Sequence, residues 1–189
     1  MKRQLKARNL LNRKSQAGMT LLETLIALVV LMVVAVSLLP MAIVAVTTTE
    51  NQGHLAARTA EYAQDKMEQL LTLAYNDVTT DTTVFPAGTC SSGCGLTIGG
   101  SANSNSPLAG YVDYLDVNGN VVTGSGGAAP ANWFYIRAWQ VSYLSTSPVD
   151  ANGVHTIKQI TVVSRVSSQV GAGGSLPQST VVALKTEPF

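Results

Sequence analysis

Glu23 lies at a position where an ionised carboxylate is unfavourable. It lies at the start of a largely aliphatic run, and no charged residue follows it until Glu50. A carboxylate within such an apolar helix is costly unless a cation pairs with it. Cleavage of the chain after Gly18 would create an α-amine on Met19, close to Glu23 in sequence. A second copy of the helix, displaced along the helix axis, would bring its own Glu23 beside that amine. The spacing therefore predicts a charge pair that forms when subunits assemble.

The same run is long enough to span a membrane. Residues 24–49 carry no charge, and about 20 apolar residues in a helix cross the hydrocarbon core of a bilayer. Basic residues gather before Gly18, where no acidic residue lies: Lys2, Arg3, Lys6, Arg8, Arg13 and Lys14. By the positive-inside rule, we expect residues 1–18 to be cytoplasmic and the chain after Glu50 to be exported. No Ala-x-Ala cleavage site lies in the amphipathic helix that is expected to follow Val46, so the apolar segment is expected to be retained.

The composition excludes other classes of protein. Charged residues make up only 12% of the 189 residues and hydrophobic residues make up 46%, so disorder driven by charge is excluded. After Gly18 the acidic residues outnumber the basic ones, which argues against an extended nucleic-acid surface. The sequence contains no Ser, His and Asp arrangement at a catalytic spacing, no phosphate-binding loop and no cluster of metal ligands. It therefore predicts no enzymatic activity and no cofactor.

The residues around the junction resemble those of a known family. Gly18 followed by Met-Thr-Leu-Leu-Glu and an aliphatic helix is similar to the class III signal peptide of type IV prepilins and type II secretion pseudopilins. The resemblance implies that a prepilin peptidase cuts after Gly18 and methylates the new amino terminus on Met19. It also implies that Glu23 guides insertion into a growing filament and that Pro40 kinks the helix. Met19 is a departure, because phenylalanine is usual at that position.

A second resemblance lies beyond the apolar run. Small and apolar residues recur at steps of three and four, which predicts an amphipathic helix whose apolar stripe faces a sheet: Ala56, Ala60, Ala63, Met67, Leu70 and Ala74, with Leu71 alongside. The segment 62–71 and the later segments 135–143, 158–163 and 181–186 resemble PilV-type minor pilins, and the first of them also resembles I-type pseudopilins. The resemblance implies a type IV pilin fold of the α+β class, in which a long N-terminal helix packs on an antiparallel sheet.

After Asn76 the composition changes to Thr, Ser, Gly, Asn and Val with frequent chain breakers, which predicts strands joined by turns. Asn118-Gly119 predicts a tight hairpin, and residues 150–153 predict a turn between two long strands. A variable loop region is expected at about 79–130. The strands themselves are expected at 82–85, 111–117, 120–123, 133–144, 154–167 and 180–185.

Two smaller constellations lie in this loop region. Cys90 and Cys94 flank a short loop in a chain that is expected to enter an oxidising compartment, so a local disulfide is predicted. Two thiols alone do not make a metal site. Asp116, Asn118 and Asn120 place oxygen-bearing side chains at alternate positions, as calcium loops do. A plain turn is favoured, because the glycine is misplaced for an EF-hand and no terminal glutamate follows.

Together these features predict a structural minor subunit of a type IV pilus. We expect a cleaved leader at 1–18, a transmembrane or filament-core helix at 19–46, an amphipathic helix at 47–76 and a β-rich periplasmic head at 77–189. The expected location is the inner membrane before assembly and the pilus afterwards. The expected partners are prepilin peptidase, the inner-membrane assembly platform, membrane lipid and other pilin or pseudopilin subunits, with no nucleic acid. A type II secretion pseudopilin and a membrane-anchored periplasmic binding module remain as alternatives.

Overall fold

The computed structural model describes residues 20–83, 90, 94–122, 128–149, 153, 155–168 and 176–187. Within this part the chain forms one long helix, α1 (Leu21–Thr72), and a six-stranded sheet. The chain divides into two compact units, Met1–Thr48 and Thr49–Phe189, and α1 contributes residues to both. From here on, the head means this second unit, so it includes the helical residues 49–72 as well as the β-rich part predicted at 77–189. Gly18, Met19 and the basic leader lie outside the described residues.

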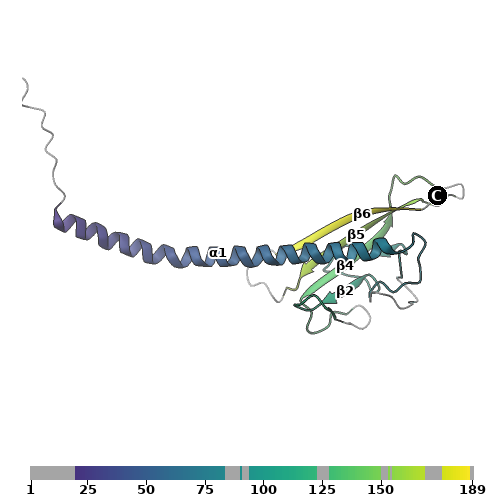
Figure 1. The fold of residues 1–189 in the computed structure, drawn as a ribbon, viewed down its shortest axis with the longest axis horizontal. Coiled ribbons are helices and arrows are strands. Elements are labelled where there is room, and N and C mark those ends of the chain that lie inside the picture. The colour runs from purple at the N-terminus through teal and green to yellow at the C-terminus, as the bar shows by residue number, and fades with distance from the viewer. Residues whose placement is uncertain are drawn as a thin grey trace, which may run out of the picture. The chain divides into compact units, whose positions relative to one another are not determined.

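Helix α1 begins directly after Thr20, and the local sequence explains this start. The hydroxyl and the carbonyl oxygen of Thr20 both accept from the backbone N–H of Glu23, at 3.3 and 3.0 Å, so Thr20 acts as the N-cap. Figure 1 shows α1 as one unbroken helix, which passes through Pro40 without ending. A proline inside a helix removes one backbone hydrogen bond. The kink at Pro40 stays a prediction.

The sheet of the head is antiparallel throughout (Figure 1). Its strands follow the order β3-β2-β4-β5-β6, and β1 also pairs with β4. The longest ladders join β4 to β5 and β5 to β6, which are connected in sequence order. The strands are β1 (Gly99–Gly100), β2 (Val112–Leu115), β3 (Val121–Val122), β4 (Tyr135–Tyr143), β5 (Ile157–Val166) and β6 (Gln178–Thr186).

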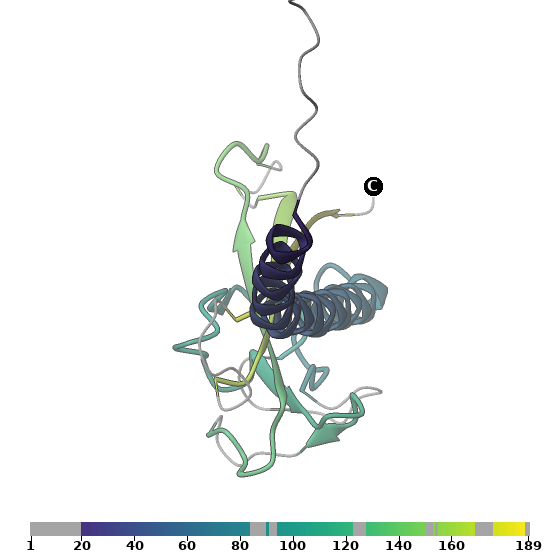
Figure 2. The ribbon, with the colours of Figure 1, turned by 90° about the vertical axis from the view of Figure 1, so that its left-hand side faces the viewer.

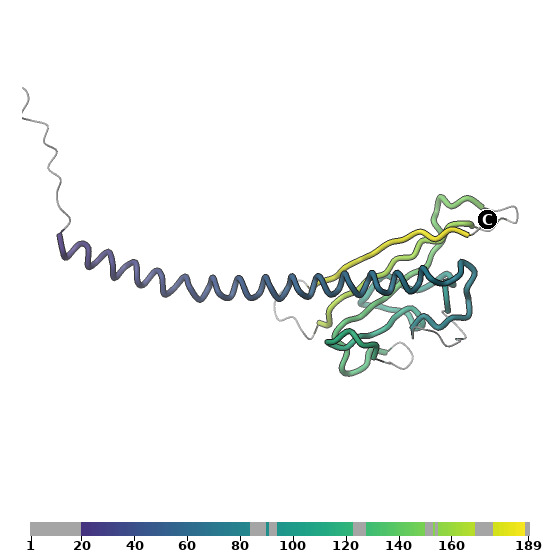
Figure 3. Tube along the Cα trace, in the orientation of Figure 1, coloured from purple at the N-terminus to yellow at the C-terminus, as the bar shows by residue number. Residues whose placement is uncertain are grey.

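The head part of α1 lies along one face of this sheet, as the tube in Figure 3 shows, and Figure 2 shows it to one side of the strands. Its buried residues are Thr59, Tyr62, Ala63, Lys66, Met67 and Leu70. The centre of the predicted apolar stripe is therefore correct, whereas Ala56 and Leu71 are exposed and Ala74 lies beyond the helix end. A long helix packed on an antiparallel sheet confirms the predicted α+β, pilin-like fold.

The core between helix and sheet explains this packing. One cluster joins α1 to the middle strands through side chains that are fully or nearly fully buried: Ala63, Met67, Leu70, Leu96, Tyr111, Trp139, Val141, Ile160 and Val162. In β5, Ile160 and Val162 alternate with residues on the opposite face, as the pleat of a strand requires. Val181 and Ala183 of β6 pack against the same cluster. The apolar alternation of the last two long strands thus sets which face the helix covers.

One strand prediction differs from the structure, and one short strand was not predicted. In the described part of the segment 82–85, Thr82 and Thr83 lie outside any strand, and the carbonyl of Thr82 instead accepts a hydrogen bond from Lys66. Strand β1 was not predicted, because it consists only of Gly99 and Gly100 and glycine does not favour a strand. The two glycines pair with β4, and the absence of a side chain lets the backbone come very close to that strand. A Cβ on Gly100 would lie 2.2 Å from the carbonyl oxygen of Trp139.

Both predicted turns lie between paired strands. Strands β2 and β3 form the hairpin expected at Asn118-Gly119, with Tyr114 paired to Val122. Gly119 has a φ of +88°, which favours glycine. Strands β4 and β5 are also antiparallel neighbours, and the isolated bridge Val149↔His155 closes the segment that joins them. Residues 150–152 of the second turn lie outside the described residues.

Candidate functional site

The structure places Glu23 in the first turn of α1, with an exposed side chain. Thr20 and Glu23 have the Thr-x-x-Glu spacing of a capping box. Sequence reasoning missed this box, although the spacing is visible in the sequence. An acidic residue in the first turn also interacts favourably with the helix dipole. Glu23 therefore has a local role at the helix start, and its expected role in assembly is a separate question.

The apolar part of α1 has no internal cover among the described residues. From Leu21 to Val46, every large aliphatic side chain is at least 48% exposed. The hydroxyl groups of Thr24, Ser37 and Thr47 donate to carbonyl oxygens of α1 itself, so these polar groups need no water. By length and composition, this helix is suited to cross a membrane. Its surface can be covered by lipid tails or by apolar helices of other subunits.

The head holds a buried ionic cluster that joins α1 to the sheet. Lys66 of α1, Asp113 of β2 and Arg137 of β4 are 1%, 3% and 3% exposed. Lys66 Nζ donates to Asp113 Oδ2 at 2.8 Å. Arg137 donates to the same carboxylate twice, from Nε at 2.7 Å and from Nη2 at 2.9 Å. One carboxylate therefore accepts hydrogen bonds from both the helix and the neighbouring strand.

Three further groups complete this cluster. Lys66 Nζ donates to the Thr82 carbonyl and lies 4.2 Å from the ring centroid of Trp139, which gives the ammonium group a favourable contact with the ring face. Arg137 Nη1 donates to Asp65 Oδ2 at 2.7 Å, and Asp65 is about half exposed. The two cations are thus balanced by two carboxylates, as buried charges require.

The protonation of the cluster follows from burial and pairing. Burial alone would raise the pKa of Asp113, but the charges of Lys66 and Arg137 outweigh burial and hold this pKa below its usual value. Burial lowers the pKa of Lys66, and Asp113 offsets this effect only in part. Because Lys66 of the helix and Arg137 of the sheet both bond to the carboxylate of Asp113, the cluster links the helix to the sheet through buried ion pairs.

Two lysines of the sheet hold the C-terminal end of α1. Lys158 Nζ donates to the carbonyl oxygens of Tyr75 and Leu96, at 2.7 and 3.0 Å, and Lys185 Nζ donates to that of Leu71 at 2.7 Å. The two lysines lie directly opposite each other in the β5–β6 register, where like charges usually destabilise a sheet. Carbonyl oxygens at and just beyond the helix end accept from both ammonium groups, which suits the negative end of the helix dipole.

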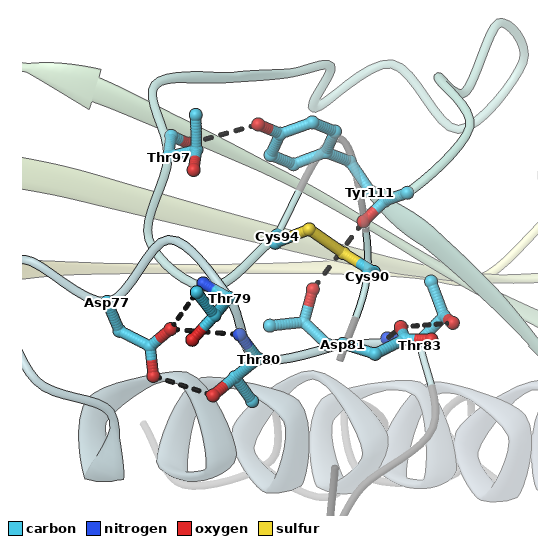
Figure 4. Close-up of a disulfide and its surroundings, with 11 residues drawn as sticks. Asp77, Thr79, Thr80, Asp81, Thr83, Cys90, Cys94, Thr97 and Tyr111 are labelled. Atoms are coloured by element: carbon cyan, nitrogen blue, oxygen red, sulfur yellow. Dashed lines mark hydrogen bonds between the residues drawn. A yellow bond between two sulfur atoms is a disulfide. The ribbon is translucent and has the colours of Figure 1, made fainter. Parts of the chain in front are cut away.

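Cys90 and Cys94 form a disulfide, with their Cα atoms 5.9 Å apart (Figure 4). Beside it, the carboxylate of Asp77 accepts from the backbone N–H groups of Thr79 and Thr80, at 2.9 and 3.0 Å, and from the Thr80 hydroxyl at 2.7 Å. The N–H of Cys90 donates to the carbonyl oxygen of Thr79 at 3.1 Å. The disulfide is thus attached to a turn that follows α1, and it has the local span that the sequence predicts.

Asp116, Asn118 and Asn120 lie together at the β2–β3 hairpin. Asp116 Oδ1 accepts from the backbone N–H groups of Asn118 and Asn120, at 2.8 and 2.9 Å, and Oδ2 accepts from Asn120 Nδ2 at 3.0 Å. These bonds, first of all those from Asn120, hold the pKa of Asp116 below its usual value. Over the described residues, no group of three His, Cys, Asp or Glu side chains is placed to hold a metal ion. The plain turn favoured by the sequence accounts for the observed bonds.

The comparisons with known proteins concern the first part of the chain. Residues 13–39 match the family model described as the prokaryotic N-terminal methylation motif. That range includes Gly18, Met19 and Glu23, together with most of the uncharged run. No curated protein and no solved structure matches the chain. Members of the pilin-like family are structural subunits and not enzymes. The first part of the chain therefore carries an N-methylation motif similar to that in the class III signal peptide of type IV pilin-like proteins.

Proposed function

We propose that the chain is a minor subunit of a type IV pilus. In this proposal the precursor is inserted in the inner membrane, with residues 1–18 in the cytoplasm and the head in the periplasm. Prepilin peptidase cuts after Gly18 and methylates Met19. The assembly platform then moves the subunit into the filament or its priming or tip complex. The observation that carries the proposal is a methylation motif joined to a helix whose apolar surface is exposed.

The physical chemistry of the apolar helix supports assembly as its task. Lipid tails are as apolar as leucine, so moving this helix from the bilayer into a bundle of similar helices brings little hydrophobic gain. Packing and polar pairs must then favour the filament. Glu23 at the helix start and the α-amine of Met19 supply such a pair, because each charge is costly when it is buried alone. In the proposal, the pair forms within one subunit or between neighbours.

Processing is the first test of the proposal. We expect mass spectrometry of the membrane-extracted protein to show a chain that begins at Met19 with a methylated amine. Gly18→Val should leave the precursor uncut in the membrane, because a side chain there prevents close approach of the scissile backbone to the peptidase. Ala17→Val is the matched control and should still be cut, since it keeps the glycine. An intact leader on the wild-type protein would support a plain membrane anchor instead.

A second experiment separates a pilus from a type II secretion system, whose pseudopilins share the motif. Cells lacking this chain are compared with cells complemented by the wild-type chain and by Gly18→Val. A minor pilin predicts loss of surface filaments on deletion, and recovery of the mature chain in sheared filaments on complementation. If filaments persist and export of folded proteins is lost, the chain is a pseudopilin and the proposed subtype is wrong.

A further inference from the structure

The two edges of the head sheet are built differently. At one edge, β3 has only two residues. At the other edge, β6 has nine residues, Gln178–Thr186, and is paired to β5 along its whole length. Over the part of the chain that the structure describes, no other strand pairs with β6. A long edge strand presents unpaired N–H and C=O groups, to which another strand can bind.

Hydrogen bonds at the two ends of β6 identify its free backbone groups. Glu187 donates its N–H to the carbonyl oxygen of Thr156 at 3.0 Å, and Val166 donates to that of Pro177 at 3.3 Å. In an antiparallel ladder, bonded pairs alternate with non-bonded pairs. The odd-numbered residues of β6 therefore bond to β5. The even-numbered residues direct their N–H and C=O groups to the free edge: Gln178, Thr180, Val182, Leu184 and Thr186.

The side chains along β6 leave this edge open. Val182 and Leu184 are 54% and 55% exposed, whereas Val181 and Ala183 pack against the core. Natural edge strands are usually protected by proline, by bulges, by short length or by outward-pointing lysines. Strand β6 contains no proline, and its lysine, Lys185, donates to the carbonyl oxygen of Leu71 in α1. That lysine therefore faces the helix and does not guard the edge.

We propose that the free edge of β6 binds an extended segment of a different polypeptide, antiparallel to β6. The backbone of that segment would bond to the even-numbered residues, in the mode by which an added strand extends a sheet. Antiparallel pairing is slightly more stable per residue than parallel pairing. The exposed side chains of Val182 and Leu184 lie on one face of β6. A partner segment would therefore have apolar side chains at alternate positions, on the face that it shares with Val182 and Leu184. The edge groups themselves favour no particular sequence.

The direction of β6 argues against antiparallel pairing of β6 with the β6 strand of a second copy of this chain. Thr59 bonds to Ser179 at the start of β6, at 2.9 Å, and Lys185 near its end bonds to Leu71. Strand β6 thus runs in the same direction as the head part of α1. Two copies paired antiparallel through β6 would have their Thr49 ends at opposite ends of the paired strands. This step rests on the proposed function, because anchors in one membrane require both Thr49 ends to face the same membrane.

Photocrosslinking of the full chain in its native membrane tests the proposal. The photoreactive residue p-benzoylphenylalanine is placed at Thr180 or at Leu184 on the free edge. The control places it at Thr161, which lies opposite Val182 on the inner strand β5. We expect mass spectrometry to map both edge links to one segment of one other protein, about four residues apart and in reversed order, as antiparallel strands require. Thr161 should give no such ordered pair of links.

Other outcomes would overturn the proposal. Links to the chain itself would indicate a second copy, and links scattered over several segments would indicate an unspecific surface. Equal links from Thr161 would indicate the sheet face, and the absence of any link would leave the edge without a partner. The leader is measured in the same sample. An uncut leader contradicts the proposed function, whereas a cut leader without edge links contradicts only this inference.

A backbone variant tests whether hydrogen bonds at the edge hold the segment. Val182→Pro removes an N–H that points to the free edge and spares the bonds between β5 and β6. We expect it to lower the yield of links from Leu184 roughly tenfold, because edge bonds and ladder geometry are both lost. Val182→Thr keeps the N–H and should retain the links. Tryptophan fluorescence must show that both variants are folded, and an unchanged link yield in folded Val182→Pro would contradict the backbone mode.

Discussion

The two parts of α1 have opposite surfaces. In the part before Thr49, large aliphatic side chains are exposed and the few hydroxyl groups bond within the helix. In the part that belongs to the head, apolar residues are buried and even a charged one, Lys66, is buried with partners. The first surface needs another molecule to cover it, whereas the second is covered by the chain itself. In the proposed function, assembly depends on the first surface, whereas the stability of the head depends on the second.

The comparison can be tested because both tryptophans, Trp133 and Trp139, lie in the head. Tryptophan fluorescence of the full chain in detergent therefore reports unfolding of the head alone. A substitution in the head should change the free energy of unfolding measured this way. A substitution in the apolar part should change assembly and leave that free energy unaltered.

Asp113→Asn should have the largest effect on the head. It leaves Lys66 and Arg137 buried without their shared carboxylate, and breaking a buried ion pair in this way costs about 3–5 kcal/mol. We expect a lower midpoint of chemical denaturation by tryptophan fluorescence, with cleavage after Gly18 unaffected. Asp65→Asn is the matched control, because the Asp65 side chain is 54% exposed, and it should cost less than about 1 kcal/mol. Similar small effects of both substitutions would show that the cluster does not hold the head together.

Acid should weaken the head through the same carboxylate. The pKa of Asp113 is lowered in the folded head, so the folded state binds fewer protons than the unfolded chain. The stability contributed by Asp113 is present above the ordinary aspartate pKa of about 3.9 and is lost as the pH falls through the lower, folded-state pKa. Denaturation from pH 7 to pH 3 should therefore show the wild type approaching Asp113→Asn in stability. A constant difference between the two proteins would contradict a lowered pKa of Asp113.

Gly119→Ala should destabilise the head less, by about 2 kcal/mol. Alanine at a φ of +88° is strained by about 1–2 kcal/mol, and its Cβ would lie 2.6 Å from the hydroxyl oxygen of Tyr62 in α1. Gly53→Ala is a control of opposite sign. Gly53 lies within α1 with no atom within 4 Å of an added Cβ, so alanine should stabilise the helix by about 0.5–1 kcal/mol. Equal effects of the two substitutions on the denaturation midpoint would argue against hairpin packing on Tyr62.

The disulfide should contribute less again. Its two cysteines are separated by four positions, and closing so short a loop stabilises by about 2 kcal/mol at most in the chain-entropy view. Cys90→Ser with Cys94→Ser should lower the denaturation midpoint only slightly, since the helix and sheet have their own core. In the exported wild-type protein, a thiol reagent should label neither cysteine before reduction and both after it. Free labelling without a reductant would refute the bridge.

The sequence was most informative where a local pattern of residues is compatible with only one kind of structure. A long uncharged run with a basic flank, the glycine of a hairpin and the alternation of the last strands led to the apolar helix, the β2–β3 turn and β4 to β6. In the strand predicted at 82–85, the described residues Thr82 and Thr83 lie outside any strand, and β1 was not predicted, because both segments depend on contacts distant in sequence. The carbonyl oxygen of Thr82 accepts a hydrogen bond from Lys66. Gly100 lies so close to the carbonyl oxygen of Trp139 that a side chain would not fit.

The ionic cluster could have been found in part. Asp113 lies between Val112 and Tyr114 in an otherwise apolar segment, and Arg137 interrupts an equally apolar one. Opposite charges on two buried strands indicate a cross-strand pair, and the register places these two residues directly opposite each other. The third member, Lys66, could not be assigned, because the helix phase that buries it depends on where the sheet lies.

Glu23 offers the sharpest test, because the smallest effect on the head is expected there. It lies in the unit that ends at Thr48, and distant, independent sites add without coupling. Glu23→Val should therefore leave cleavage and the unfolding of the head unchanged, while recovery of the mature chain in sheared filaments falls. Glu23→Gln separates the two roles of this residue, since glutamine serves a capping box as well as glutamate does but cannot pair with an α-amine as an anion. If Glu23→Gln also fails to enter filaments, the charge is needed for assembly. If Glu23→Gln enters at the wild-type level and Glu23→Val does not, the residue acts only at the helix start, and the amine pair has no part in assembly.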